Sequence, residues 1–301
     1  MSELVFRGIE ITDKPWIDKA LKASQFRGCE YTFGNNFVWR RVYRVEIAQL
    51  MPYYFVRWGM DDGTYKFSFP TGGCDVKTGV ELLKDYCREN DFALHIYANR
   101  GITEQIQEFY PEVSVSYNRD GSDYVYLAED LAELKGKKYH SKRNHLNRFY
   151  ENDWSFEPIT PDNMAECIKM NEQWCSENIC ELGCDSEAQS KEDESCIVRC
   201  SFKYYDRLGY TGGLIRVNGE VQAFCFGEPS ADDTFVVHVE KALKNYQGAY
   251  TAINREFVKY LGGRYKYINR EEDTGAENLR KAKLSYHPVF LEDKFDITFG
   301  G

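Results

Sequence analysis

A strand, a helix and a second strand follow one another over residues 234–270, and this unit restricts the possible folds more than any other stretch. Residues 234–240 (TFVVHVE) are typical of a strand, and residues 247–261 (QGAYTAINREFVKYL) are typical of a helix that ends at two glycines. Apolar side chains recur in that helix at the i, i+4, i+7 and i+8 positions of a helix packed on a sheet. The two strands are therefore predicted to be parallel, because a helix joins them by a right-handed crossover.

An antiparallel hairpin is expected just before this unit. Residues 214–217 and 220–226 are predicted as two strands, and Asn218-Gly219 between them is the strongest short-range signal for a type I′ turn. Antiparallel strands should therefore lead directly into the parallel pair.

A last helix is expected after the second strand. Thr274 and Glu277 have the spacing of a capping box, which predicts a helix from about Gly275 to Pro288. Its buried stripe is expected to consist of Ala276, Leu279, Ala282 and Tyr286.

Charged residues crowd the edge where the second strand ends. Four successive charges occupy residues 270–273, and Arg280 and Lys283 share one face of the predicted helix. We predict that Asn269, Arg270, Arg280 and Lys283 bind a phosphate or carboxylate group, since arginine side chains bind such groups bidentately. The alternative is an ordinary helix with salt bridges along its surface, such as Glu277 with Lys281.

The order of these elements is that of the GNAT acyltransferase fold: antiparallel strands, a helix entered through a glycine turn, a parallel strand and a last helix. The chain also resembles the uncharacterised family related to the C-terminal domain of phosphatidylglycerol lysyltransferase. That resemblance rests on GGLIRVNGEVQAFCFGEP, DDTFVVHVEKAL, YQGAYTAIN and YINREEDTGAENLRKAKLSYHP, with KGKKYHSKRNHLNRF at 135–149. It implies an α+β fold of two tandem GNAT-like units with mixed, mostly antiparallel sheets, as in the Fem-type peptidyl transferases.

The first half of the chain repeats the order of elements. Helices are predicted at residues 13–26, 76–90 and 102–109, and strands at 43–50, 53–59, 65–69, 92–98, 113–117 and 124–128. This order supports an internal duplication, and the alternative is an unrelated α/β domain. We therefore predict an N-terminal GNAT-like domain at 1–128, a basic linker helix at 129–152 and a C-terminal GNAT-like domain at 153–301.

Composition is compatible with this architecture. The chain of 301 residues is 43% hydrophobic and 15% aromatic, which is ample for a sizeable core. It has no apolar run near the roughly 18 residues of a membrane span, and its first residues lack the layout of a signal peptide. We expect a soluble, cytoplasmic protein without a transmembrane segment, in which the ten cysteines are reduced thiols.

Residues 135–149 form a basic segment in a chain whose net charge is −10. A local cluster of cations points to an anionic, phosphate-bearing partner, such as tRNA or a phospholipid headgroup, because bound cations release counterions. The residues predicted to bind it are Lys138, Lys142, Arg143 and Arg148. The alternative is a solvated linker helix between the domains.

Six cysteines lie between residues 167 and 200: Cys167, Cys175, Cys180, Cys184, Cys196 and Cys200. Two pairs separated by three residues could bind zinc, but they lack the two-residue spacing of a zinc ribbon. No metal is expected.

The resemblance implies amide- or ester-forming transfer, which needs a base for the acceptor and an acid for the leaving group. Glu240 and Glu271 are the candidate bases, and His238, which should share a strand face with Glu240, is a candidate proton relay. The resemblance places the leaving-group acid on the last helix, where Tyr286 lies.

The donor is predicted to bind at the glycine turn before the central helix, because free N–H groups and the helix dipole favour an anion there. The cofactor-binding candidates are Gln247, Gly248, Ala249, Tyr250 and Asn254. Tyr250 stands where the acetyl-CoA loop pattern has glycine or alanine, so coenzyme A and aminoacyl-tRNA both remain possible donors. The expected function is acyl or aminoacyl transfer to a polar or lipid amine or hydroxyl, and the alternative is a non-catalytic tandem module that binds an anionic ligand.

Overall fold

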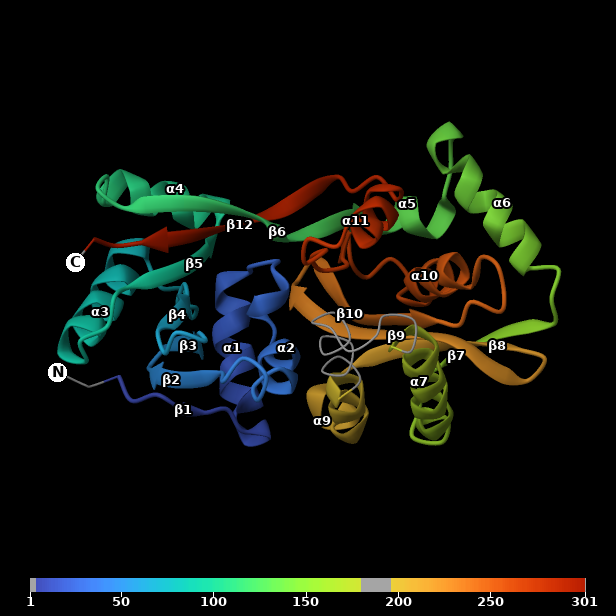
Figure 1. Cartoon of the computed structure of the whole chain (residues 1–301), viewed down its shortest axis with the longest axis horizontal. Helices are drawn as coiled ribbons and strands as arrows, with labels where there is room; N and C mark the ends of the chain where they lie inside the picture. The colour runs from blue at the N-terminus through green and yellow to red at the C-terminus, as the bar shows by residue number, and fades with distance from the viewer. Residues whose placement is uncertain (1–3, 180–195, 301) are drawn as a thin grey trace.

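The computed structural model describes residues 4–179 and 196–300. In this part of the chain twelve strands form one continuous sheet, and helices lie on both of its faces (Figure 1). The first half contains β1 (Arg7–Gly8), α1 (Lys14–Ser24), α2 (Phe33–Val38), β2 (Glu46–Leu50), β3 (Tyr53–Gly59), β4 (Tyr65–Ser68), α3 (Val76–Glu89), β5 (His95–Asn99), α4 (Arg100–Phe109) and β6 (Ser114–Leu127).

Two helices, α5 (Ala128–Glu133) and α6 (His140–Phe149), connect this half to the second. The second half contains β7 (Trp154–Pro158), α7 (Met164–Ile179), α9 (Tyr205–Leu208), β8 (Thr211–Val217), β9 (Glu220–Ala231), β10 (Thr234–Ala242), α10 (Ala249–Tyr260), β11 (Tyr267–Asn269), α11 (Glu277–Leu284) and β12 (Phe290–Thr298). Short 3-10 helices include η2 (Cys29–Tyr31) and η3 (Lys137–Tyr139).

The two halves repeat one topology. In each, antiparallel strands lead to a parallel pair that encloses a helix: β4 and β5 around α3, and β10 and β11 around α10. Among the described residues these are the only parallel neighbours in the sheet, so it is mixed and mostly antiparallel. The prediction of two tandem GNAT-like units in an α+β fold is confirmed.

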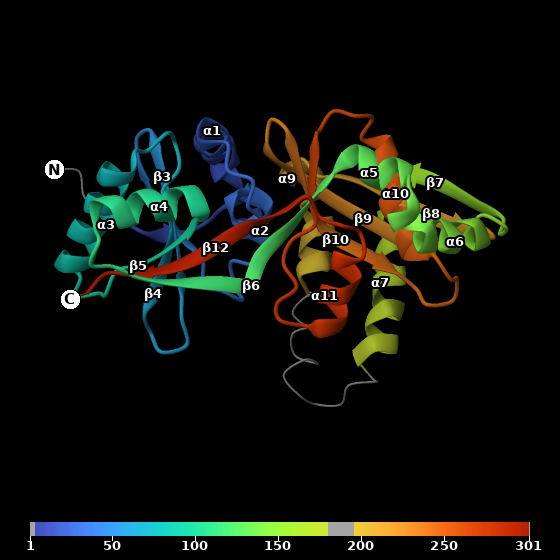
Figure 2. The same ribbon diagram turned by 90° about the horizontal axis from the view of Figure 1, so that it is seen from above.

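The last strands of the two units are exchanged. The sheet order is β1-β2-β3-β4-β5-β12-β6-β11-β10-β9-β8-β7, so β12 of the second unit pairs with β5 of the first, and β6 of the first pairs with β11 of the second. Figure 2 shows β6 and β12 side by side where they join the two units. Sequence analysis did not predict β12, and it divided β6 into two strands at the irregularity opposite β12.

Within residues 4–179 and 196–300 the core consists of three apolar clusters, and the alternation of the strands explains their positions. One cluster lies on the sheet face covered by α1, α2, α7 and α9, and it is continuous between the units. On the opposite face, α3 and α4 cover the first unit, whereas α5, α6 and α10 cover the second. Along β9, for example, Phe224 belongs to the shared cluster, and its neighbours Ala223 and Cys225 belong to the cluster under α10. The units are therefore packed together through a common core.

The predicted hairpin turn is confirmed, since Asn218 and Gly219 have φ values of 52° and 82°. The predicted stripe of the last helix is wrong except for Tyr286. Helix α11 begins at Glu277 after Ala276, which makes no side-chain cap in the described structure, so the capping box is absent. Ala276 and Ala282 are exposed and Leu279 is 41% exposed, because the buried side of α11 carries Lys283 instead. In the described residues no helix is long and apolar enough to cross a membrane.

Candidate active site at the junction of the two units

Strands β10 and β11 run together only briefly before they diverge. They pair from Thr234 to Val236, after which β10 continues to Ala242 while the chain after Asn269 turns away. Polar side chains from both halves of the molecule gather at this divergence.

One group of side chains in the divergence surrounds Arg270. Its Nη2 donates to Glu240 Oε1 at 2.7 Å, and its guanidinium lies 4.6 Å from the ring centroid of Tyr286. Nη1 of Arg270 is buried and has no hydrogen-bond partner in the described structure. The second oxygen of Glu240 accepts from Asn254 at 3.1 Å. One nitrogen of the Arg270 guanidinium is thus left without a hydrogen-bond acceptor in the described structure.

Lys142 joins this group from α6, with its ammonium 3.7 Å from the ring centroid of Tyr286. Burial and the neighbouring charge of Arg270 lower the pKa of Lys142 to about 8, against the opposing effect of Glu240. A lysine with such a pKa exchanges a proton readily near neutral pH. The hydroxyl of Tyr286 bonds to Thr251 Oγ1 at 3.1 Å, and burial raises its pKa.

A second group is centred on His238. Nδ1 lies 2.7 Å from Glu271 Oε1 and Nε2 lies 3.1 Å from Glu228 Oε1. Burial lowers the pKa of His238, but the hydrogen bonds with the two carboxylates outweigh it and raise the pKa to about 10. At neutral pH His238 is therefore an imidazolium that donates from both nitrogens. In that state neither nitrogen can accept a proton, and the role of His238 as a proton relay stays a prediction.

Burial raises the pKa of Glu271, although its bond with His238 acts in the opposite direction. The structure brings Glu271 and His238 together as predicted but separates both from Glu240. A register shift between Val237 and Val239 of β10 changes the alternation of the strand. The predicted common face of His238 and Glu240 is consequently not found, and the roles of Glu240 and Glu271 as bases stay predictions.

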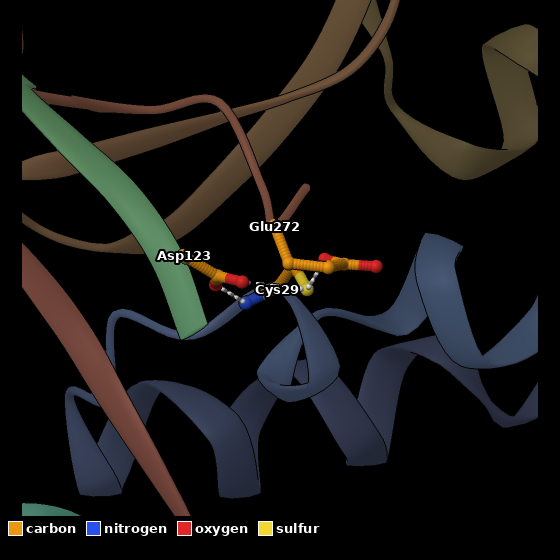
Figure 3. A group of neighbouring side chains, drawn as sticks. All are labelled: Cys29, Asp123 and Glu272. Carbon is orange, nitrogen blue, oxygen red and sulfur yellow. Dashed lines mark hydrogen bonds between the residues drawn. The ribbon is translucent and has the colours of Figure 1, made fainter. Parts of the chain in front are cut away.

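A third group holds the exchanged strands together. Asp123 of β6 accepts from the backbone N–H of Cys29 at 2.8 Å and from Lys294 of β12 at 2.6 Å. Figure 3 shows Cys29, Asp123 and Glu272 converging from three distant segments, a set whose ligand atoms lie within 4.8 Å of one another and could hold a metal ion. The ammonium of Lys294 already lies 3.4 Å from Cys29 Sγ. Its positive charge stands where a metal ion would otherwise supply one.

The side chain of Asn269 links these groups, because its Nδ2 donates to Asp123 at 2.8 Å and its Oδ1 accepts from the N–H of Glu271 at 2.7 Å. Both polar atoms of the Asn269 side chain thus have partners within the chain, and its role as an anion ligand stays a prediction. Sequence analysis missed Cys29, Asp123, Glu228 and Lys294. These residues lie in four segments that are far apart in the chain, so no local pattern connects them. Only Glu228 had a local signal among these four, as a charged residue in the mostly apolar strand β9.

The predicted donor turn is covered on one side by α6. Gly248 has a φ of 95°, and a Cβ on it would lie 2.3 Å from the carbonyl oxygen of His145. Gln247 accepts from Arg148 Nη1 at 2.9 Å, which fixes the turn to the same helix. The close approach of α6 therefore explains the glycine without a bound phosphate. Ala249 is buried and Tyr250 is 40% exposed, and the donor-binding role of the turn stays a prediction.

The basic residues predicted to bind anions mostly have partners within the chain. Lys138 bonds to Asp130 at 2.9 Å, and Arg143 donates to the carbonyl oxygens of Leu134 and Gly136. In the last helix Arg280 pairs with Asp273 and Asp120, and Lys283 donates to the carbonyl oxygens of Arg270 and Glu272. These contacts tie Arg280 and Lys283 to neighbouring loops, and anion binding by the two residues stays a prediction.

The cysteine-rich stretch contributes nothing to these groups in the described structure. Cys167 and Cys175 belong to α7 and are buried. Cys196 is exposed and Cys200 is half-buried. Cys180 and Cys184 lie outside the described residues.

Comparison with known proteins agrees with the fold. The model of the family described as "Phosphatidylglycerol lysyltransferase, C-terminal" matches residues 21–298. A conserved protein of unknown function from Bacteroides thetaiotaomicron has a crystal structure that is 34% identical, with a TM-score of 0.91 over 99% of this chain and 100% of its own. The structure of L-PGS from Bacillus licheniformis is 13% identical, with a TM-score of 0.58 over 82% of this chain and 80% of its own. The uncharacterized protein MYCGA3080 of Mycoplasmoides gallisepticum is 22% identical over 72% of this chain and 69% of its own length.

The fold and the charged junction define a tandem GNAT-like protein of acyltransferase type. Because the family model covers most of its length, the chain belongs to the family of the phosphatidylglycerol lysyltransferase C-terminal domain. The likeness to L-PGS, at 13% identity, concerns the fold alone.

Proposed function

We propose that the protein transfers an aminoacyl group from aminoacyl-tRNA to a hydroxyl or amine of a phosphate-bearing acceptor, such as a phospholipid headgroup. The observation that carries the choice of donor is the packing of α6 on the turn at Gly248. A coenzyme A pyrophosphate would need that turn, whereas an aminoacyl ester needs only access to the divergence between β10 and β11. Membership of the lysyltransferase-related family supports the same donor.

In this proposal Glu271 removes the proton from the acceptor. Its raised pKa brings it closer to the operating pH, where a general base is most effective. The imidazolium of His238 holds the Glu271 carboxylate in position at 2.7 Å. Nucleophilic attack on the ester carbonyl places negative charge on its oxygen, and the unpaired N–H of Arg270 is the donor that stabilises it.

The leaving group is the ribose hydroxyl of the tRNA, which needs a proton as the ester bond breaks. Tyr286 remains the proposed acid, and the charge of Arg270, 4.6 Å from its ring centroid, favours loss of the tyrosyl proton against the effect of burial. Glu240 keeps Arg270 oriented through its 2.7 Å contact. The proposed roles thus divide into one base, one oxyanion donor and one acid, with their partners as positioning residues.

The test is transfer of radiolabel from a mixed aminoacyl-tRNA pool to vesicles that contain phosphatidylglycerol, followed by lipid extraction. Glu271→Gln should reduce the rate by about 10²–10⁴-fold, the usual contribution of a general base. Glu277→Gln is the matched control, since Glu277 is an exposed glutamate paired only with Lys281 in the described structure, and its rate should be unchanged.

Coenzyme A provides the opposing arm of the test. If it bound, a concentration about 100 times its Kd would stabilise the protein by roughly 2.7 kcal/mol in a thermal-shift titration. Such a shift would refute aminoacyl-tRNA as the preferred donor. A wild-type rate in Glu271→Gln would refute the assigned base.

A further inference from the structure

Glu228 is a buried carboxylate beside the site that the proposed reaction does not use. It belongs to β9, is 4% exposed, and its Oε1 lies 3.1 Å from Nε2 of His238. On the other side of the imidazole ring, Nδ1 lies 2.7 Å from Oε1 of Glu271, the proposed base. His238 is therefore held between two carboxylates, and of these Glu271 is the partly exposed one.

The first unit holds Glu228 in place. The backbone N–H of Gly34, in α2, donates to the same Oε1 atom at 2.7 Å, and the ammonium of Lys14, in α1, lies 3.9 Å from Oε2. A Cβ on Gly34 would lie 2.3 Å from Glu228 Oε1 and 2.3 Å from the hydroxyl oxygen of Tyr210, so a larger residue would push the carboxylate aside. Two elements of the first unit thus contact a carboxylate of the second.

The two carboxylates together keep a charge on the buried ring. Burial by itself favours the neutral imidazole, because the interior of a protein solvates a charge poorly. The hydrogen bonds with Glu228 and Glu271 outweigh burial and raise the pKa of His238 to about 10. Tyr210 also packs on the ring, with 5.6 Å between the ring centroids, but burial raises its pKa, so it is neutral and cannot replace a lost carboxylate.

We propose that Glu228 is a positioning residue that keeps His238 protonated, and that the first unit acts on the site in the second unit through it. The imidazolium then donates to Glu228 and to Glu271 at once, which fixes the orientation of the Glu271 carboxylate. The inference rests on the proposed function, because it concerns the base assigned there. It gives the first unit a part in the reaction that needs no contact with substrate.

The expected effect on the base follows from the charge of His238. Burial and the charges of Glu272 and Asp123 raise the pKa of Glu271, whereas the hydrogen bond with His238 lowers it. With a neutral His238 this opposing contribution would be lost, and the pKa of Glu271 would rise further. A larger fraction of Glu271 would then be protonated at neutral pH and unable to take a proton from the acceptor.

An NMR titration of the histidine ring signals tests the charge of His238 without any substrate. The chain has five histidines, so the signals of His238 can be assigned by their loss in His238→Gln. Glu228→Gln keeps the size of the side chain and an oxygen for Gly34 but removes the charge. It should lower the proton affinity of His238 by about tenfold or more, as loss of a hydrogen-bonded opposite charge predicts. Glu220→Gln, an exposed glutamate of the same strand, should leave the midpoint unchanged.

The transfer assay with phosphatidylglycerol vesicles then tests the effect on the base. In Glu228→Gln the pH at which the rate reaches half of its maximum on the acidic side should move upward, with a lower kcat and an unchanged KM for the acceptor. Glu228→Asp keeps the charge and should remain closer to the wild type. Gly34→Ala displaces the carboxylate from the side of the first unit, should change both readouts in the same direction, and serves as the second variant if Glu228→Gln unfolds.

An unchanged His238 midpoint in Glu228→Gln and in Gly34→Ala would overturn the proposal. A lowered midpoint with the pH profile of the wild type would also overturn it, because Glu228 would then have only a structural role. A wild-type protein without transfer activity would refute the proposed function instead, and the NMR titration would still decide whether Glu228 sets the charge of His238.

Discussion

Replacing Gly248 by alanine tests whether α6 closes the N-terminus of α10. Gly248 has a φ of 95°, and an added Cβ would lie 2.3 Å from the backbone oxygen of His145 and 3.2 Å from the Cβ of Phe149. Backbone atoms cannot move aside as the end of a flexible side chain can. The substitution should therefore either displace α6 or strain the turn.

Gly263 is the matched control, because its φ is 71° and nothing in the part of the chain that the structure describes lies within 4 Å of an added Cβ. Gly263→Ala should lower the free energy of unfolding by about 1–2 kcal/mol, the cost of a left-handed conformation for a residue with a Cβ. Gly248→Ala should lower the free energy of unfolding by the same amount and by about a further 1–3 kcal/mol, because the added Cβ overpacks the contact with α6. Gly263→Ala should thus be more stable to unfolding than Gly248→Ala by roughly 1–3 kcal/mol.

Urea unfolding followed by tryptophan fluorescence measures this difference. The dependence of the free energy of unfolding on urea concentration should be the same in both variants, so that a shift in midpoint reports stability alone. Equal losses in the two variants would refute the close packing of α6 on the turn. Equal losses would also remove the structural explanation for Gly248, and with it the main argument against a coenzyme A donor.

Three further predictions concern the junction. The pKa of His238 is raised from 6.5 to about 10, so its ion pairs should stabilise the fold fully below about pH 6.5 and lose this contribution as the pH rises through about 10. Urea unfolding at a series of pH values should show this fall in the free energy of unfolding in the wild type and not in His238→Gln. Lys294→Met leaves the carboxylate of Asp123 buried without its cation and should cost about 3–5 kcal/mol, most of which Asp123→Asn in the same chain should restore if the pair is the cause. Removal of residues 289–301 deletes β12 and should expose β5 to limited proteolysis, and protection equal to that of the full chain would contradict the strand exchange.

Local patterns were sufficient to predict the central elements of the second unit. The helix expected at 247–261 is α10 (Ala249–Tyr260), and the strand expected at 234–240 is β10 (Thr234–Ala242). Both have an apolar face against the sheet that repeats with the period of the element. The hairpin turn was predictable because positive φ values at two successive positions select Asn-Gly.

The exchanged strand β12 was not predictable in the same way. Its sequence is FLEDKFDIT, with the charged residues Glu292, Lys294 and Asp296 at every second position. Charged residues at these positions do not predict a strand in the interior of a sheet. Lys294 is only 2% exposed because Asp123 from a strand about half the chain away neutralises it. The partner strand is unknown until the topology is known, so the burial could not be inferred.

The same reason explains the error in α11. A lysine on the inner face contradicts the apolar stripe on which a helix prediction rests. The ammonium of Lys283 is satisfied by carbonyl oxygens of the loop after β11, which adopts positive φ values at Glu271 and Thr274. Local periodicity therefore failed where the interior of the junction is polar.

The exchanged strands also carry the buried charges, and this gives the ion pair between Asp123 and Lys294 a role in strand register. β6 and β12 pair on both sides of an irregularity, with Asp123 opposite Glu292 and Lys294 opposite Asn118. A slip by one residue would turn Lys294 to the other face of the sheet and leave Asp123 buried without a cation. That loss, about 3–5 kcal/mol, is large compared with the difference in apolar burial between neighbouring registers of a strand that contains four charged residues. The buried pair consequently selects one register of β6 on β12, and in that register Lys294 also lies 2.9 Å from Glu30 and 3.4 Å from Cys29 Sγ.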